Sequence, residues 1–176
     1  MNLKRTSKHL LMTHWQVKRA FPARTARALA QALKDSQSAH VGQVHFTVEG
    51  ALHSRALFKG QSAQQRALEV FSNLRVWDTE HNNGLLIYLL LADRAVEIVA
   101  DRAIYSKVSS QEWDGICREM QTAFKAGNYE GGVVGGIQVV TQHLIQHFPA
   151  CRAEHPAGST PMQPPSIIHT ATRRAS

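Results

Sequence analysis

The order of apolar and polar residues predicts three strands. Residues alternate strictly between Gln43 and Glu49, which is typical of a strand with one buried face. The run from Leu85 to Leu91 is apolar throughout, so we expect a strand that is covered on both faces. A short turn over residues 92–95 leads to a third strand, 96–100, which should pair with the second as an antiparallel hairpin.

Apolar residues at helical spacing predict helices around these strands. Two of them begin with capping-box patterns, Ser62 with Gln65 and Ser109 with Glu112. The expected helices cover residues 8–20, a segment that opens at Pro22, residues 62–74, a segment from Ser109 to about Gly127, and residues 130–147.

The connections between these elements define a fold class. Because a helix joins the first two strands, they should lie parallel with a right-handed crossover, and the third strand should add antiparallel at one side. The prediction is an α/β fold, a three-layer sandwich of a mixed β-sheet with helices on both faces. We divide the chain into a basic N-terminal helix (1–20), an α/β domain (21–149) and a disordered proline-rich tail (150–176).

Cysteine content and hydropathy bear on the cellular compartment of the protein. Cys117 and Cys151 are the only cysteines and are far apart, which excludes a disulfide scaffold and a four-cysteine zinc site. No apolar run approaches the ~20 residues of a transmembrane span. Reduced thiols favour a cytoplasmic protein, peripheral to the inner membrane. The alternative is a transit peptide, because the N-terminal stretch is basic and free of acidic residues.

Charge is concentrated at one end of the chain. The first 34 residues contain eight Lys and Arg and no Asp or Glu, whereas the net charge of the whole chain is +7. Such a segment suits an acidic protein partner or an anionic membrane surface, and a solvated helix face is the plainer interpretation. Nucleic acid is not an expected partner, because the tryptophans are widely separated and no aromatic residues interleave with the basic ones.

The hairpin predicts an acidic edge of the sheet. It places the loop that contains Asp78, Glu80, Asn82 and Asn83 beside Asp101, where the third strand ends. Oxygen ligands of this kind suit Ca²⁺ or Mg²⁺. Asp78, Asn83 and Asp101 are therefore the candidate metal ligands. The alternative is a polar loop with turn-forming asparagines and a capping aspartate.

Two further patterns favour structural roles. Glycines at 131, 132, 135 and 136 match no phosphate-binding loop, and small residues at this spacing favour close approach of two helices. His143 and His147 share a helix face but lack the glutamate of a zinc-protease motif, and they suit a helix C-terminus.

Several segments, in a fixed order, carry a family resemblance. They are Trp77, the run Asn83-Gly84-Leu85-Leu86-Ile87, Asp93-Arg94, Val96-Glu97-Ile98, the run from Phe124 to Tyr129, Gly132 and Gly136-Ile137. Together they resemble the TPM domain family over about residues 25–148. The resemblance implies a mixed sheet between helices, acid phosphatase activity in some members, and binding of divalent cations, notably Ca²⁺, in acidic loops.

Two functional hypotheses follow. In the first, the chain is a non-catalytic binding module whose basic N-terminal region engages an acidic protein or an anionic membrane surface. In the alternative, it is a phosphatase-like phosphomonoester hydrolase: a cation held by Asp78, Asn83 and Asp101 polarises the phosphoryl group and Arg102 offsets the developing charge. We favour the binding module, because residues 100–104 replace the glycine-rich, glutamate-ending segment of the family.

Overall fold

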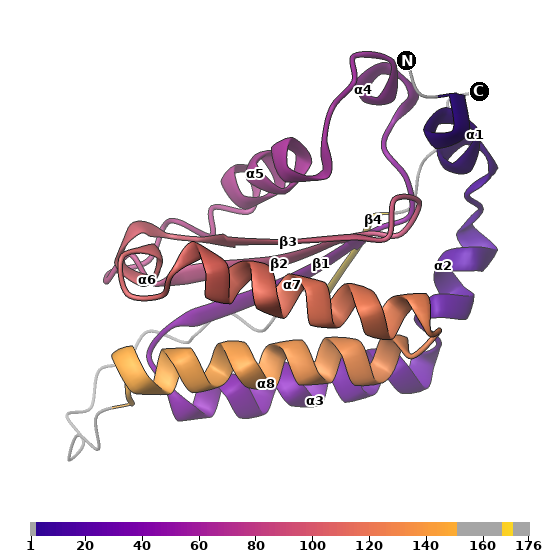
Figure 1. Cartoon of the computed structure of the whole chain (residues 1–176). Helices are drawn as coiled ribbons and strands as arrows, with labels where there is room; N and C mark the ends of the chain where they lie inside the picture. Colours follow the sequence, from indigo (N-terminus) through magenta and orange to yellow (C-terminus); the bar gives the residue numbers. More distant parts are fainter. Residues whose placement is uncertain (1–2, 151–166, 171–176) are drawn as a thin grey trace.

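A four-stranded mixed sheet forms the centre of the computed structural model, which describes residues 3–150 and 167–170 (Figure 1). Its strands are β1 (Gln43–Glu49), β2 (Gly84–Leu90), β3 (Ala95–Ala100) and β4 (Ile167–Thr170), in the spatial order β3-β2-β1-β4. β1 is parallel to β2 and β4, and β2 is antiparallel to β3. The predicted parallel pair and hairpin are confirmed.

Helices cover both faces of this sheet, which confirms the predicted α/β sandwich. One face carries α5 (Ala63–Asn73), which follows the short α4 (Ser54–Phe58). The other face carries α3 (Ala23–Ala39), α7 (Ser110–Lys125) and α8 (Tyr129–His147), with α8 between α3 and α7. The one-turn helix α6 (Arg102–Tyr105) follows β3. Both predicted capping boxes, at Ser62 and Ser109, open their helices as expected.

The two sides of β2 explain its unbroken apolar sequence. Leu85, Ile87 and Leu89 pack into the core beneath α3, α7 and α8. Leu86, Tyr88 and Leu90 pack into a second core beneath α5. Every residue of β2 is buried, so no position of this strand can carry a solvated side chain.

The N-terminal region corrects one prediction. Instead of a single helix over residues 8–20, there are two, α1 (Leu3–Leu11) and α2 (His14–Ala20). Thr13 separates them in an extended conformation (φ −104°, ψ 156°), and its N–H donates to Oε1 of Gln16 at 3.1 Å. Thr13 therefore begins a new helix where the apolar spacing alone suggested continuity.

Three short elements were not predicted. α4 lies between the first predicted strand and the helix predicted at residues 62–74, and α6 follows the third strand. The proposed disordered tail, 150–176, falls mainly on residues outside those described. Within it, Ile167–Thr170 form β4 beside the second half of β1. Four residues are too few for a recognisable period, and their pairing with β1 spans more than 100 positions of sequence.

Candidate functional site

The hairpin joins the two segments of the predicted acidic edge. The Asp101 N–H donates to the Gly84 carbonyl at 2.8 Å, and the Ala103 N–H donates to the Asn82 carbonyl at 3.2 Å. The Arg102 guanidinium also donates to Oδ1 of Asn82 at 2.9 Å. The loop before β2 and the segment after β3 therefore lie side by side, as the sequence predicted.

Asn83 and Gly84 have clear structural roles at this edge. The Asn83 side chain is buried, and its Nδ2 donates to the Val41 carbonyl at 3.2 Å, which ties the loop to the start of β1. The Asn83 N–H donates to Oγ1 of Thr79 at 2.9 Å. A side chain at Gly84 would overlap the Val76 carbonyl, so only glycine fits there. The Asn-Gly pair thus shapes the loop whatever else it does.

The proposed acidic ligands differ in what they offer. Asp101 caps α6, with Oδ1 accepting from the Arg102 N–H at 2.7 Å, while its Oδ2 is buried without a hydrogen-bond partner among the described residues. Asp78 is exposed on a turn. Within the described part of the chain, no three His, Cys, Asp or Glu side chains gather as a metal site would require. Among the described residues, the edge therefore has one buried carboxylate oxygen without a hydrogen-bond partner, and no assembled set of acidic ligands.

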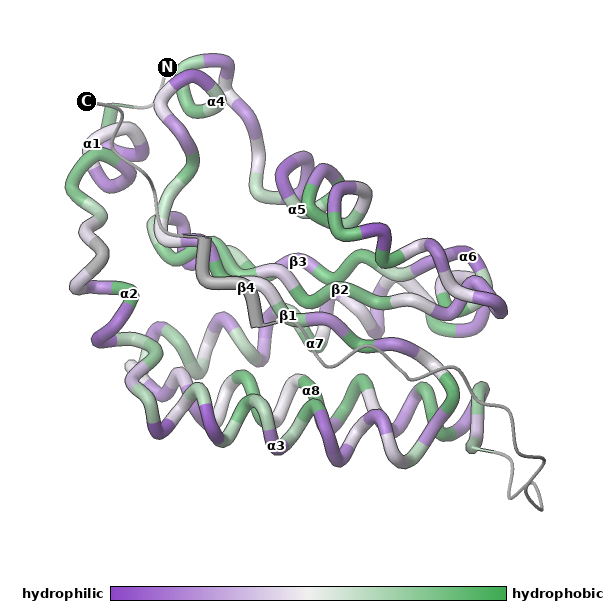
Figure 2. Tube along the Cα trace, turned by 180° about the vertical axis from the view of Figure 1, so that it is seen from behind, coloured by the Kyte–Doolittle hydropathy of each residue, from purple (hydrophilic) through white to green (hydrophobic). Residues whose placement is uncertain are grey.

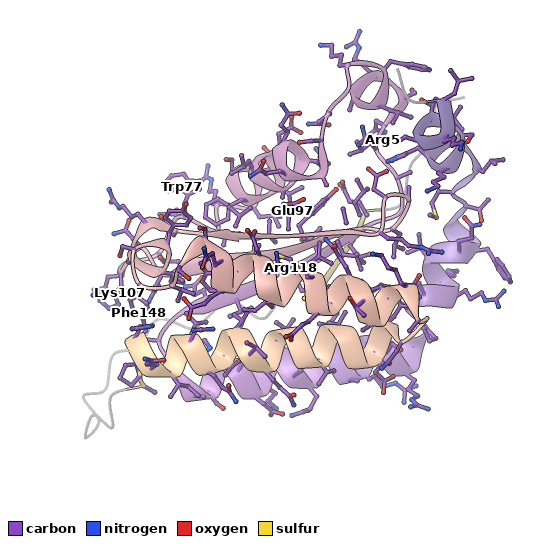
Figure 3. All side chains as sticks on the ribbon, viewed as in Figure 1. Arg5, Trp77, Glu97, Lys107, Arg118 and Phe148 are labelled. Atoms are coloured by element: carbon purple, nitrogen blue, oxygen red, sulfur yellow. The ribbon has the colours of Figure 1, made fainter. Side chains whose placement is uncertain are left out.

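Asp93 anchors α1 at the opposite end of the hairpin. Arg5 donates to both Asp93 oxygens, through Nε at 3.0 and 3.2 Å and through Nη2 at 2.8 Å. His9 contacts the same carboxylate through Nε2 at 3.0 Å, and its Nδ1 accepts from the Leu52 N–H at 3.0 Å. Figure 3 shows Arg5 between α1 and the body of the domain. Sequence reasoning missed this cluster, because Arg5 and Asp93 are 88 positions apart.

The Asp93 carboxylate is held in its charged form. Burial opposes ionisation, but the hydrogen bonds from Arg5 and His9 outweigh burial and lower the pKa of Asp93 below its usual value. Because Nδ1 of His9 accepts a backbone hydrogen bond, the neutral ring carries its proton on Nε2 and donates to Asp93. The helix α1 is therefore docked through polar side chains that satisfy one another.

The same helix turns its large apolar side chains outward. Leu3, Leu10 and Leu11 are 76%, 64% and 71% exposed, whereas His9 is only 4% exposed. Figure 2 shows a hydrophobic stretch of α1 on the outer edge of the molecule. An amphipathic helix on a globular domain normally buries its apolar side, so the orientation of α1 is the reverse of the usual one.

The helix α2 continues this surface. Trp15 is 64% exposed, and the Arg19 guanidinium lies 5.4 Å from the centre of its ring. Exposed basic side chains flank the apolar ones on both helices: Lys4, Lys8, Lys18 and Arg19. We call the outward sides of α1 and α2 the N-terminal surface; its apolar members are Leu3, Leu10, Leu11 and Trp15. Among the described residues, no helix is long and apolar enough to cross a membrane.

Comparison with known proteins assigns the class and then the family. The fold is a mixed sheet between helical layers, and the TPM domain model matches residues 17–143. The chain belongs to the TPM domain family, as the ordered motifs around Asn83-Gly84 and Asp93-Arg94 suggested. The matched region begins within α2, so α1 lies outside it. A search of curated proteins finds no match.

Two solved structures are similar to this chain. The chain is similar to the BA42 protein of the psychrophilic bacterium Bizionia argentinensis, at 30% identity and a TM-score of 0.63, over 72% of this chain and 83% of that one. It is also similar to the N-terminal domain of a P. gingivalis protein, at 19% identity and a TM-score of 0.61, over 76% of this chain and 82% of that one. The second likeness shows the fold alone.

Proposed function

We propose that this TPM domain is a non-catalytic binding module that docks on an anionic bilayer surface through its N-terminal surface. The supporting observation is the reversed orientation of α1, whose leucines face outward while Arg5 and His9 face the domain. Burying one leucine is worth about 1.5–3 kcal/mol, so four exposed apolar side chains in 13 residues leave much to be gained from an apolar environment.

The positive charge of the N-terminal surface favours an anionic partner. Lys4, Lys8, Lys18 and Arg19 are exposed, and no acidic residue occurs in α1 or α2. A bilayer with anionic headgroups offers negative charge at its surface and hydrocarbon just beneath it, which matches basic side chains beside leucines and a tryptophan. An acidic protein would satisfy the charge as well, and the test below separates the two.

Sedimentation with vesicles tests the proposal. The chain should sediment with vesicles that contain phosphatidylglycerol and remain in solution with pure phosphatidylcholine, and raising the salt should release it. The pair Leu10→Ser and Leu11→Ser should weaken binding on the order of 100-fold. The pair Lys8→Glu and Lys18→Glu should weaken it at least about 10-fold, since each cation near the surface contributes about 1 kcal/mol.

Matched controls lie on other helices. Leu68 on α5 and Ile145 on α8 are also exposed, so Leu68→Ser and Ile145→Ser should leave vesicle binding unchanged. Lys34→Glu and Lys125→Glu, on α3 and α7, control for total charge. Equal losses in test and control variants would refute docking through α1 and α2. Binding to polyglutamate but not to vesicles would assign the surface to an acidic protein.

A second proposal, a divalent-cation-dependent phosphatase-like hydrolase, concerns the sheet edge. It is supported by the buried, unpartnered Oδ2 of Asp101. Asp101, Asp78 and Asn83 would hold Ca²⁺ or Mg²⁺, and Arg102 would offset phosphoryl charge. Hydrolysis of p-nitrophenyl phosphate, measured with and without each cation, should be lost in Asp101→Asn. Activity that persists in Asp101→Asn and Asp78→Asn would remove this proposal.

A further inference from the structure

A cavity of about 580 Å³ lies between α4 and α5, on the opposite face of the sheet from α3, α7 and α8. Leu52, His53 and Ala56 form part of its lining, and the other lining residues have charged or amide side chains: Arg55, Lys59, Gln61, Gln65, Arg66 and Glu69. Three of these side chains are cationic and one is anionic. None of the lining residues belongs to the acidic edge at Asp101, so the cavity is a separate site. The net charge of its lining is positive, whereas that edge carries carboxylates.

One of its cations is held in place by a buried network. Glu49, at the end of β1, accepts from Nε of Arg66 at 2.9 Å and from Nη2 at 2.7 Å. The same buried carboxylate accepts from the Tyr88 hydroxyl at 2.6 Å. The remaining nitrogen, Nη1, donates to the half-exposed Glu69 at 3.0 Å. Arg66 is thus a cation fixed by Glu49, and its Nη1 contacts a carboxylate that is itself half exposed to solvent.

The other two cations, Arg55 and Lys59, have no partner among the described residues that a ligand would need to displace. Arg55 and Lys59 lie four residues apart at α4 and are both exposed, and no hydrogen bond or ion pair from either side chain is found among the described residues. Gln61 lines the same cavity, and its Nε2 donates to Oε1 of Glu69 at 2.6 Å. The cavity therefore has three cationic side chains on its lining, and two of them make no hydrogen bond or ion pair with another described residue.

We propose that this cavity binds a phosphate monoester. Arg66 Nη1, Arg55 and Lys59 contact the phosphate oxygens. A phosphate monoester carries close to two negative charges at neutral pH and accepts several hydrogen bonds, which suits a fixed guanidinium with two mobile cations beside it. The ligand displaces Glu69 from Arg66 and from Nε2 of Gln61, and that amide then donates to a phosphate oxygen instead.

The monoester has two possible sources. It is either a phosphorylated small molecule or the headgroup of a lipid such as phosphatidic acid. The lipid source is structurally reasonable because α1 contacts α4, and Arg5 donates to the Gln61 carbonyl at 2.8 Å. Phe58, next to Lys59, is also 57% exposed. Only the lipid source depends on the bilayer docking proposed above.

Titration of the full chain with glycerol 3-phosphate, followed by NMR, tests the site without any membrane. Amide shifts should concentrate between Arg55 and Glu69, and glycerol alone should cause none. The pair Arg55→Ala and Lys59→Ala should weaken binding about 10-fold or more, whereas Glu69→Gln should strengthen it about threefold, since it frees Arg66. Lys107→Ala with Arg118→Ala is the matched control, because both residues are exposed and lie away from α4 (Figure 3).

Vesicles then separate the two sources. If the lipid is the ligand, Arg55→Ala with Lys59→Ala lowers affinity for phosphatidic acid while leaving affinity for phosphatidylglycerol, a diester, nearly unchanged. If the ligand is a small molecule, the two lipids bind alike, and only the glycerol 3-phosphate titration responds to the substitutions. Absence of shifts at residues 55–69, or equal loss in the control pair, overturns the cavity site but leaves the docking of α1 untouched.

Discussion

At the scale of single residues, local patterns were predictable and long-range partners were not. Ser62 and Ser109 cap their helices as the spacing of Gln65 and Glu112 indicated, because a capping box is complete within four residues. The ion pair of Arg5 with Asp93 has no local signal, since its two members meet only when α1 docks on the β2–β3 turn. The position of Asp101 beside Gly84 followed from the predicted hairpin. That its Oδ2 is buried without a partner among the described residues depends on packing, which the sequence does not reveal.

Asp93 makes the docking of α1 sensitive to acid. Its pKa is lowered in the folded chain, so the stabilisation is present above its usual value of 3.8 and is lost as the pH falls through the lower folded value. Relative to the intrinsic exchange rate, which itself slows in acid, amide hydrogen exchange of residues 5–11 should accelerate below about pH 4. Asp93→Asn should accelerate it already at pH 7, by a factor equivalent to about 1–3 kcal/mol. Asp114→Asn, exposed on α7, should not.

His45 predicts a second, milder pH dependence. Burial lowers the pKa of this β1 residue below its usual 6.5, and its buried Nδ1 has no partner among the described residues. The unfolded chain therefore takes up this proton more readily, and the free energy of unfolding should fall as the pH drops below about 6.5, by on the order of 1 kcal/mol. Urea unfolding at pH 7 and pH 5 measures it. His45→Phe should flatten the dependence, while a response unchanged from wild type would assign the effect elsewhere.

At the scale of elements, the sequence predicted whether a segment is a helix or a strand better than it predicted which face of a helix packs against the domain. The spacing of Leu10, Leu11 and Trp15 correctly predicts helical structure. It also predicts one continuous helix to residue 20, whereas the structure has two helices. Helical periodicity shows which residues share one face of a helix, but it does not show whether that face packs against the domain or faces solvent. In α1 the polar contacts of Arg5 and His9 decide the orientation, and the leucines remain outside.

The glycines of α8 allow a matched test of the helix contact that the sequence predicted. A Cβ at Gly132 would lie 2.7 Å from the Phe124 ring and 2.9 Å from Cβ of Ala123, whereas one at Gly135 would meet nothing within 4 Å. Gly132→Ala should lower the free energy of unfolding by about 1–3 kcal/mol. Gly135→Ala should raise it by about 0.5–1 kcal/mol, because alanine favours the helix. Equal effects in urea unfolding would contradict close approach of α7 and α8 at Gly132.

At the scale of the whole molecule, connectivity constrained the fold. A helix between β1 and β2 required a parallel pair, and a four-residue turn required the β2–β3 hairpin, so most of the sheet followed from chain order. β4 did not follow, because nothing between α8 and Ile167 indicates that the chain returns to β1. The cavity between α4 and α5 was equally unpredictable, since it depends on how a short helix packs after β1.

The arrangement of the tryptophans predicts how the molecule sits on a bilayer. Trp15 belongs to the N-terminal surface, while Trp77, 50% exposed, lies at the opposite end of the sheet (Figure 3). Trp113 is buried in the core and should not respond to lipid. If the docking end carries α1 and α2, phosphatidylglycerol vesicles should shift the tryptophan emission to the blue, and brominated lipids should quench it.

Substitution of each exposed tryptophan then fixes the orientation. Trp15→Phe should abolish most of the blue shift and of the quenching, whereas Trp77→Phe should leave both in place. The matched pair controls for loss of a fluorophore, since each variant removes one exposed indole. Loss of the response in Trp77→Phe alone would contradict this orientation, because it would mean that the end with Trp77 faces the bilayer. The acidic edge at Asp101 would then face the membrane, where anionic headgroups would repel its carboxylates. An end-on orientation through α1 is the arrangement that places the positive charge, the leucines and the cavity beside α4 on the lipid side together.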